Sequence, residues 1–269
     1  MKLFDTHCHL DDSVYAGDME AVIQRARLAG VEAMMIAGIN AESSRKAVSI
    51  AEWKPEIYAS VGIHPHDARD CREESLEFLR GLTGSGKVRA WGEVGLDFNR
   101  MHSSGADQER WLIRQLEIAG DLNLPVIFHE RDSKGRFLEI LRGSWGKGKR
   151  GVVHCFSGNE RELGQYLSMG LYIGITGILT VKGRGAQLRE LLRYVPLEHI
   201  VVETDAPYLT PVPEKNQTKR NEPAFVRSVF LKLAEVRQEN PETLAETIWE
   251  NSCRLFGINP ETRTKGLNC

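Results

Sequence analysis

Short apolar runs alternate with amphipathic segments along nearly the whole chain. The first run, residues 2–10, and seven later runs have the length and the aliphatic content that are typical of buried strands. The later runs span 31–37, 57–63, 88–94, 125–129, 151–156, 171–175 and 199–205. Helical spacing predicts helices between them, at 18–29, 41–53, 73–82, 107–122, 134–141, 160–169 and 185–194, with two more at 223–239 and 241–255.

The order of these elements predicts the fold. Eight strands that alternate with helices, in a chain of 269 residues, favour a (β/α)8 TIM barrel of the α/β class. A doubly wound open sheet is the alternative, but no glycine-rich phosphate loop follows the first strand. Because no charge block or low-complexity stretch interrupts the pattern, we expect one barrel domain over residues 1–258, including the C-terminal helices, and a short tail over 259–269.

Histidines and carboxylates stand where the predicted strands give way to loops. His7 and His9 close the first strand, and side chains two apart on a strand share a face, so the two imidazoles would form a chelate. The later strand ends carry His64, Glu93, His129, His154 and Asp205. Each of these taken singly is equally well explained as a core or rim residue. In a barrel, however, all carboxyl strand ends meet at one rim, and the whole set favours a metal centre there.

The number of donors indicates two ions. Four of the histidines together with two carboxylates exceed what one catalytic tetrahedral site needs if it keeps an open position. Glu93 is the natural bridge between two ions, since Gly92 and Gly95 around it permit a close approach. Two divalent cations can activate a water and stabilise both oxygens of a phosphoryl displacement. We expect Mg²⁺ or Mn²⁺, with Zn²⁺ as the alternative.

Other polar residues near the strand ends have weaker assignments. Asp205 is placed to orient or deprotonate the attacking water, and Glu203 is predicted to support it, with a structural salt bridge as the alternative. Loop cations that could steer phosphates are Arg131, Lys182, Arg184, Lys219 and Arg220, and for each a solvated surface charge is the alternative. Cys8 and Cys155 adjoin predicted ligands, but strand alternation turns them toward the helices, so we interpret both as core packing.

Composition narrows the remaining classes. With 41% hydrophobic residues and no long apolar run, the chain is predicted to have no membrane span, and without a basic and apolar leader it is expected in the cytoplasm. A formal net charge of −2 argues against a broad basic surface, so phosphate binding should be local. The five cysteines contain no CxxC pair and are expected as free thiols. No obligatory protein partner is indicated.

Eight ordered blocks carry a family resemblance: DTHCHL, SVGIHPH, GEVGLDF, PVIFHERD, VVHCFSG, IGITGILT, VETDAPYLTP and KRNEP. In this order and spacing the chain resembles the TatD family of metal-dependent deoxyribonucleases, among the amidohydrolase-type barrels. The resemblance implies that His7, His9, Glu93 and Asp205 hold one metal ion, and that Glu93, His129 and His154 hold the second. It also implies that His64 contacts a substrate phosphate.

Three functional hypotheses follow from these residues and this resemblance. The first is a metal-dependent exonuclease that removes nucleotides from the 3′ end of single-stranded DNA, with RNA as an alternative substrate. The second is a two-metal hydrolase of another bond, such as an aminoacyl-tRNA ester, a lactone or an amide, because the same barrel serves many hydrolyses. The third is a catalytically silent barrel that binds metal. The complete set of predicted ligands counts against the third hypothesis.

Overall fold

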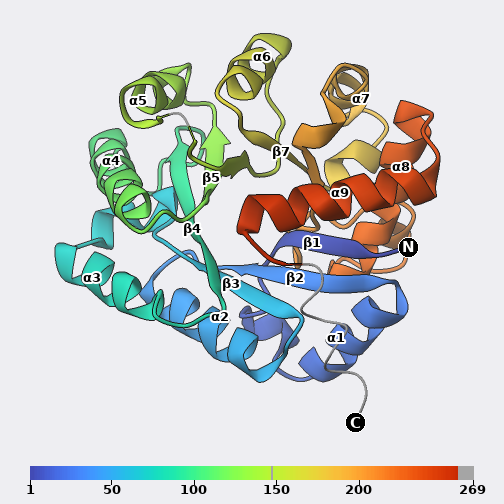
Figure 1. Cartoon of the computed structure of the whole chain (residues 1–269), viewed down its shortest axis with the longest axis horizontal. Helices are drawn as coiled ribbons and strands as arrows, with labels where there is room; N and C mark the ends of the chain where they lie inside the picture. The colour runs from blue at the N-terminus through green and yellow to red at the C-terminus, as the bar shows by residue number, and fades with distance from the viewer. Residues whose placement is uncertain (147, 260–269) are drawn as a thin grey trace.

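The computed structural model describes residues 1–146 and 148–259, and its strands form one eight-stranded parallel sheet in the order β1 to β8 (Figure 1). The strands are β1 (Leu3–Cys8), β2 (Val31–Ala37), β3 (Ile57–Val61), β4 (Val88–Asp97), β5 (Val126–Arg131), β6 (Gly151–Val153), β7 (Tyr172–Ile175) and β8 (Ile200–Val202). Cys8 pairs with Ala206, and the Asp205 amide donates to the His7 carbonyl at 2.9 Å, so the β1 and β8 ends meet. The predicted (β/α)8 barrel is confirmed.

Helices surround the sheet and alternate with its strands. They are α1 (Met19–Leu28), α2 (Ala41–Trp53), α3 (Glu73–Leu82), α4 (Gly105–Asp121), α5 (Arg136–Ser144), α6 (Glu160–Ser168), α7 (Ala186–Leu192), α8 (Val226–Arg237) and α9 (Pro241–Phe256). Side-chain caps stabilise the beginnings of several helices. The Asn40 side chain accepts a hydrogen bond from the Ser43 amide at 3.0 Å at the beginning of α2, and Asn159 and Glu162 form a reciprocal capping box on α6. Their apolar faces bury a continuous core against the outside of the barrel.

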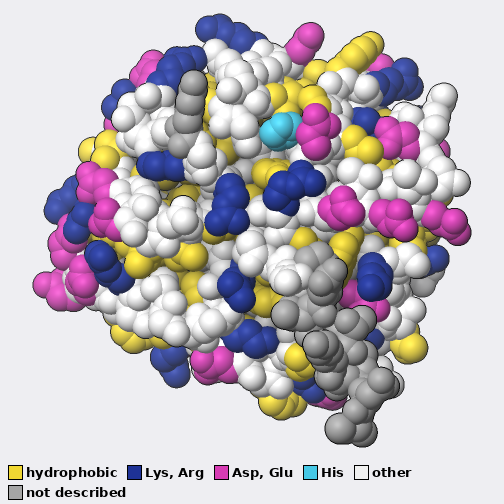
Figure 2. Space-filling view, in the orientation of Figure 1, with side chains coloured by type: hydrophobic (Ala, Val, Ile, Leu, Met, Phe, Trp, Pro, Cys, Tyr) yellow, Lys and Arg dark blue, Asp and Glu magenta, His cyan; other side chains and the backbone are white. Residues whose placement is uncertain are grey.

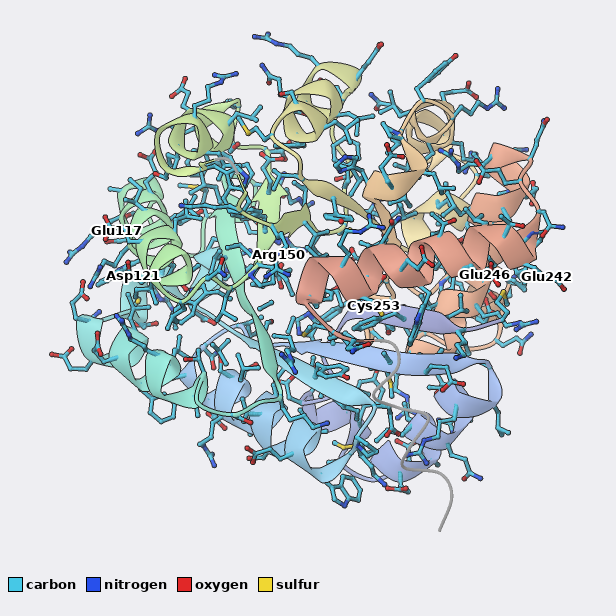
Figure 3. All side chains as sticks on the ribbon, viewed as in Figure 1. Glu117, Asp121, Arg150, Glu242, Glu246 and Cys253 are labelled. Carbon is cyan, nitrogen blue, oxygen red and sulfur yellow. The ribbon has the colours of Figure 1, made fainter. Side chains whose placement is uncertain are left out.

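The interior of the barrel is apolar at the end where the strands begin. Phe4, Met35 and Ile127 point into this base together with other inward-facing strand residues, all of them buried. Helix α9 crosses this end of the barrel in Figure 1, and its Phe256 ring lies 5.6 Å from that of Phe4. The guanidinium of Arg150, the residue before β6, donates to two carbonyls in the last turn of α9, and Figure 3 labels this arginine. The base is thus closed by packing and by a helix cap.

The outer surface of the base has mixed polarity. Figure 2 shows lysine, arginine and acidic side chains interspersed with apolar ones on this face, and Figure 3 places Glu242 and Glu246 on its α9 part. No helix within the described ranges combines the length and the apolar character needed to cross a membrane. The predicted tail, 259–269, lies outside the described residues except for Asn259.

Several strand ends differ from their predicted positions, and the differences fall at the opposite, carboxyl end of the barrel. β6 stops at Val153 and β8 at Val202, so His154, Glu203 and Asp205 lie in the loops that follow. β1 has a register shift between Asp5 and Cys8, which interrupts the alternation of its side chains. The predicted helix at 223–239 is a short 3-10 turn, η6 (Pro223–Phe225), followed by α8.

Candidate metal centre and substrate pocket

The carboxyl end of the barrel opens into a pocket of about 550 Å³. His9, His64, His129 and His154 line it together with Glu93 and Asp205, and His7 lies behind them, fully buried. These seven residues lie on six strands or directly after them, and the strands are far apart in sequence. The structure therefore brings together all the residues that the sequence placed at this rim.

One group of donors surrounds the first strand. His7 Nε2 lies 3.3 Å from His9 Nε2 and 3.3 Å from Glu93 Oε2, while Asp205 Oδ1 lies 3.4 Å from His9 Nε2. Ligand atoms that each sit about 2 Å from one transition-metal ion are separated from each other by about 3 Å. Two imidazole nitrogens facing each other between two carboxylates thus have the spacing and the chemistry of a cation site.

Glu93 connects this group to a second one. Its Oε2 faces His7, whereas its Oε1 lies 2.8 Å from His129 Nδ1, 3.5 Å from His64 Nε2 and 3.9 Å from His154 Nε2. Glu93 is only 3% exposed, and imidazoles lie on both sides of its carboxylate. A carboxylate with one oxygen directed at each donor group has the geometry of a bridging ligand.

The glycines around Glu93 permit a close approach of two backbones. Gly92 and Gly95 have φ values of +136° and +158°, and a Cβ on Gly95 would lie 1.7 Å from the His129 carbonyl oxygen. A Cβ on Gly92 would lie 2.5 Å from the Ile127 carbonyl oxygen. These glycines let β4 approach the backbone of β5, and this approach carries Glu93 and His129 toward each other.

The electrostatics of the cluster arise from burial and from histidine–carboxylate pairing. Burial lowers the pKa of His64 to about 4 and also lowers that of His7. Burial alone would lower the pKa of His9 as well, but the hydrogen bond and charge of Asp205 raise it to about 9. Burial would raise the pKa of Glu93, but electrostatic attraction to the surrounding histidines and the hydrogen bond from His129 hold it well below its usual range. Protons on the imidazoles therefore compensate the negative charge of the buried carboxylates.

The residues present fit divalent metal ions. His7 Nδ1 is a buried polar atom with no hydrogen-bond partner, and the donors are the neutral imidazoles and carboxylates that such ions bind. Three sets of side chains have ligand atoms close enough to hold an ion: His7 with His9 and Glu93, His7 with His154 and Asp205, and His64 with His66 and His129. The third set was not predicted from the sequence.

Glu203 is fully buried and lies against His154 rather than Asp205. Its Oε1 accepts the Cys155 amide at 2.6 Å and lies 2.8 Å from His154 Nδ1. Asp205 has a φ of +57°, and its side chain is directed at His9 instead. Glu203 therefore orients His154, in the way that a carboxylate behind a histidine ligand usually does.

Sequence reasoning did not identify a second histidine–carboxylate pair in the pocket. His66 Nε2 lies 2.7 Å from Asp97 Oδ2, and Asp97 also lies 3.3 Å from His129 Nε2 and accepts the Asn99 amide at 3.0 Å. His66 and Asp97 belong to the SVGIHPH and GEVGLDF blocks, so their place at strand ends was a signal that could have found them. Asp97 fixes the orientation of both imidazoles.

The loop cations divide into two classes. Arg220 forms ion pairs with Asp18, 2.7 Å apart, and has a structural role. Arg131 lies at the end of β5, lines the pocket, is exposed and makes no ion pair with another described residue. Arg184 lines a neighbouring groove that Arg131 also lines. Arg131 is thus available to a ligand, whereas Arg220 is not.

Cys8, Cys71 and Cys155 are free thiols, as expected. The fifth, Cys269, lies outside the described residues. Cys8 is buried in the core between the barrel and its helices, and its Sγ contacts the Met35 carbonyl oxygen at 3.4 Å. Cys155 packs against the same core, and burial raises the pKa of both thiols. Neither belongs to the donor groups, in agreement with the prediction of core packing.

Comparison with known proteins gives full-length similarity to one family. The family described as "TatD related DNase" matches residues 4–257. A 3′-5′ ssDNA/RNA exonuclease TatD from Escherichia fergusonii is 39% identical over 259 residues, covering 96% of this chain and 100% of that protein. The protein of the same name from Cronobacter sakazakii is 40% identical over 256 residues, covering 94% and 97% of the two chains.

Solved structures agree with this result. The TatD homologue YJJV from Escherichia coli K12 has a TM-score of 0.88 and 32% identity, covering 96% of this chain and 98% of that one. A hydrolase of the TatD family from Entamoeba histolytica, at 24% identity and a TM-score of 0.87, has the same fold and covers 96% and 99% of the two chains. With the family match, the sequence identity and the barrel in agreement, the chain belongs to the family of TatD-related DNases.

Proposed function

We propose that the chain is a metal-dependent exonuclease that hydrolyses phosphodiester bonds from the 3′ end of single-stranded DNA, with RNA as an alternative substrate. The observation that carries the proposal is the position of Glu93 between two groups of donors. The relatives at about 40% identity are named 3′-5′ ssDNA/RNA exonucleases. Their names favour phosphodiester hydrolysis over the ester, lactone or amide hydrolysis that the sequence left open.

Two divalent ions, Mg²⁺ or Mn²⁺ with Zn²⁺ as the alternative, would be held by six residues. His7, His9, Glu93 and Asp205 would bind the first, and Glu93, His129 and His154 the second. Such a pair of ions activates a water and stabilises the charge on the transferred phosphoryl group. Glu203 would keep the His154 ring in place from behind, 2.8 Å from its Nδ1.

Asp205 is the proposed base of the reaction. Its Oδ1 faces His9, which leaves Oδ2 as the atom that would accept the proton of the attacking water. Burial would raise the pKa of Asp205, but the hydrogen bond from His9 and the charge of His154 hold it below its usual value. The carboxylate is therefore ionised at neutral pH and able to accept a proton.

His64 and Arg131 are the proposed phosphate contacts. His64 Nδ1 accepts the His66 amide at 3.1 Å, so the neutral ring carries its proton on Nε2. That N–H is directed into the site, toward Glu93, and would donate to a phosphate oxygen placed there. Arg131 stands farther out, exposed and without an ion pair to a described residue, where it would contact a phosphate of the same strand.

The test is digestion of a single-stranded oligonucleotide labelled at its 5′ end, with Mg²⁺ or Mn²⁺. Removal of nucleotides from the 3′ end would give a ladder of progressively shorter labelled products. A reaction from the other end would release the label at once as a mononucleotide and would contradict the proposed polarity. Protein stripped of metal by a chelator is the matched control, and its activity should return when the ion is restored.

A cytoplasmic location is part of the proposal. The free thiols of Cys8, Cys71 and Cys155 support it, because reducing compartments keep cysteines unpaired. Recovery of reduced protein from cells lysed with a thiol-trapping reagent would agree with it. Disulfide-linked peptides under the same conditions would contradict it.

A further inference from the structure

The pocket around the donor groups has two chemically different sides. In a ring of eight strands, β8 and β1 are neighbours, while β4 and β5 lie across the barrel from them. The loops after β1 and β8 contribute Asp11, Asp12 and Tyr208 to the pocket. The loop after β4 contributes Arg100 and the end of β5 contributes Arg131, while the Asp97 carboxylate on this side is buried and paired with His66 and His129. An anionic strand that enters this pocket therefore meets acidic and aromatic groups on one side and cations on the other.

Tyr208 is unusual among the residues that line the pocket. It supplies the one phenol ring among the described lining residues, and 55% of its surface is exposed. Its ring centroid lies 6.0 Å from that of His9, a proposed metal ligand, at an interplanar angle of 66°. A large aromatic side chain is thus open to solvent directly beside a proposed metal ligand. An exposed ring lacks the free energy that its burial would contribute to the stability of the fold.

The backbone that carries Tyr208 is held firmly. Its amide donates to the Asp205 carbonyl at 2.8 Å, and its own carbonyl accepts from Asn221 Nδ2 at 2.6 Å. The same amide group of Asn221 also donates to the Thr204 carbonyl at 2.9 Å, and Asn221 is fully buried. The ring is therefore presented from a rigid loop that also carries Asp205, which fixes its distance from the site of hydrolysis.

The charges favour a base, and not a phosphate, on this side. Asp11 and Asp12 repel phosphate, and each already accepts a hydrogen bond from the protein, from the Ser43 hydroxyl at 2.7 Å and the Val14 amide at 2.8 Å. On the other side, Arg100 and Arg131 are exposed and make no ion pair within the described part of the chain. Aromatic rings bind the faces of single-stranded bases without regard to sequence, while cations follow the backbone.

We propose that Tyr208 is the platform on which the base of the 3′-terminal nucleotide stacks, while the rest of the strand leaves the pocket over Arg100 and Arg131. This inference rests on the proposed exonuclease function and adds a nucleobase subsite to it. It places the scissile phosphate between the two sides, at the donor groups. Stacking on one ring face also predicts tolerance of all four bases at the terminal position.

The test compares two substrates and three variants. The substrates are a single-stranded oligonucleotide and the same oligonucleotide with a 3′-terminal residue that lacks its base. The variants are Tyr208→Ala, Tyr208→Phe and, as a matched control, Tyr194→Ala, which removes a tyrosine that is 81% exposed and lies outside the pocket. Rates with Mg²⁺ are measured as KM and kcat, and melting temperatures show that each variant is folded.

Tyr208→Ala should raise KM for the normal oligonucleotide by about 5- to 150-fold, because base–aromatic stacking contributes about 1–3 kcal/mol. It should leave KM for the base-free oligonucleotide nearly unchanged, since the stacked group is already missing. Tyr208→Phe should behave like the parent, because it retains the ring, and so should Tyr194→Ala. Equal weakening of both substrates, a Tyr208→Phe variant as poor as Tyr208→Ala, or an unchanged KM would each overturn the proposal.

Equilibrium binding separates this inference from the proposed function. The same oligonucleotides, carrying a fluorophore at the 5′ end, are titrated with each variant under conditions that prevent turnover, and anisotropy is followed. Loss of affinity in Tyr208→Ala for the normal oligonucleotide alone would support stacking even if the parent digested no DNA. In that case only the exonuclease function would be contradicted.

Discussion

The two ends of the barrel consist of the same eight strands but are stabilised in opposite ways. At the base, Phe4 and Phe256 pack in an apolar cluster that α9 covers. At the carboxyl end, Glu93 and Glu203 are buried among imidazoles, and no lysine or arginine within residues 1–146 and 148–259 forms an ion pair with either. The base is held together by apolar packing, whereas at the rim the buried carboxylates are paired with histidines.

Because of this difference, the stability of the fold and the reaction should depend on different ends of the barrel. Buried apolar groups stabilise the fold in proportion to the area removed from water, while buried charges without partners cost free energy. A change at the base should therefore alter the free energy of unfolding and leave the reaction intact. A change at the rim should impair the reaction and leave the free energy of unfolding nearly unaltered. Four experiments test this expectation.

The largest effect is expected for Glu93→Ala, which removes the carboxylate between both donor groups. Loss of metal-assisted catalysis should lower kcat for single-stranded DNA on the order of a thousandfold or more, or about 4 kcal/mol of transition-state stabilisation. Glu117→Ala on the outside of α4, labelled in Figure 3, is the matched control and should digest DNA like the parent. If Glu93→Ala binds two ions and digests DNA normally, the proposed mechanism is wrong.

The next effect concerns the base. Phe256→Ala should lower the free energy of unfolding by about 3–5 kcal/mol, because it leaves a cavity beside Phe4. Urea titration measures this loss, and kcat of the folded variant should stay at the parental value. Leu231→Ala, at a side chain that is 44% exposed on α8, should change stability by less than about 0.5 kcal/mol. A parallel loss of kcat in folded Phe256→Ala would show that the two ends are coupled.

Metal should stabilise the rim. At about one hundred times its dissociation constant, Mn²⁺ should raise the free energy of unfolding by about 2.7 kcal/mol for each independent site. The increment should be the same in Phe256→Ala, whose donors are intact, and smaller in Glu93→Ala. Urea titrations with and without the ion measure it. An equal increment in Glu93→Ala would place the bound ion elsewhere.

A smaller effect is expected from pH. Carboxylates raise the pKa of His9 and of His129 to about 9, outweighing the burial that would lower both, so the metal-free protein holds these protons at pH 7. Metal requires neutral imidazoles and must displace the protons, so its affinity should fall as pH falls below 9, by up to about tenfold per unit for each proton. Calorimetry in buffers of different ionisation enthalpy should detect the released protons. An enthalpy that is independent of the buffer would contradict this.

The sequence by itself determined the barrel and the composition of its rim. Apolar runs and helical spacing fix the order of elements, and a closed parallel sheet then brings every carboxyl strand end to one side. For this reason His7, Glu93, His129 and Asp205 could be predicted to converge without knowledge of any contact. The strand order of a barrel follows from the succession of strands and helices, and the local pattern of apolar residues predicts that succession.

Only the tertiary structure decided which side chains face each other. Glu203 lies against His154 and not beside Asp205, because β8 ends at Val202 and Asp205 adopts a positive φ. His66 lies against Asp97, and Tyr208 lies beside His9, through loops whose paths no periodicity predicts. The two-residue period of a strand is valid only while the strand continues, and His66, Glu203 and Tyr208 all lie beyond the strand ends.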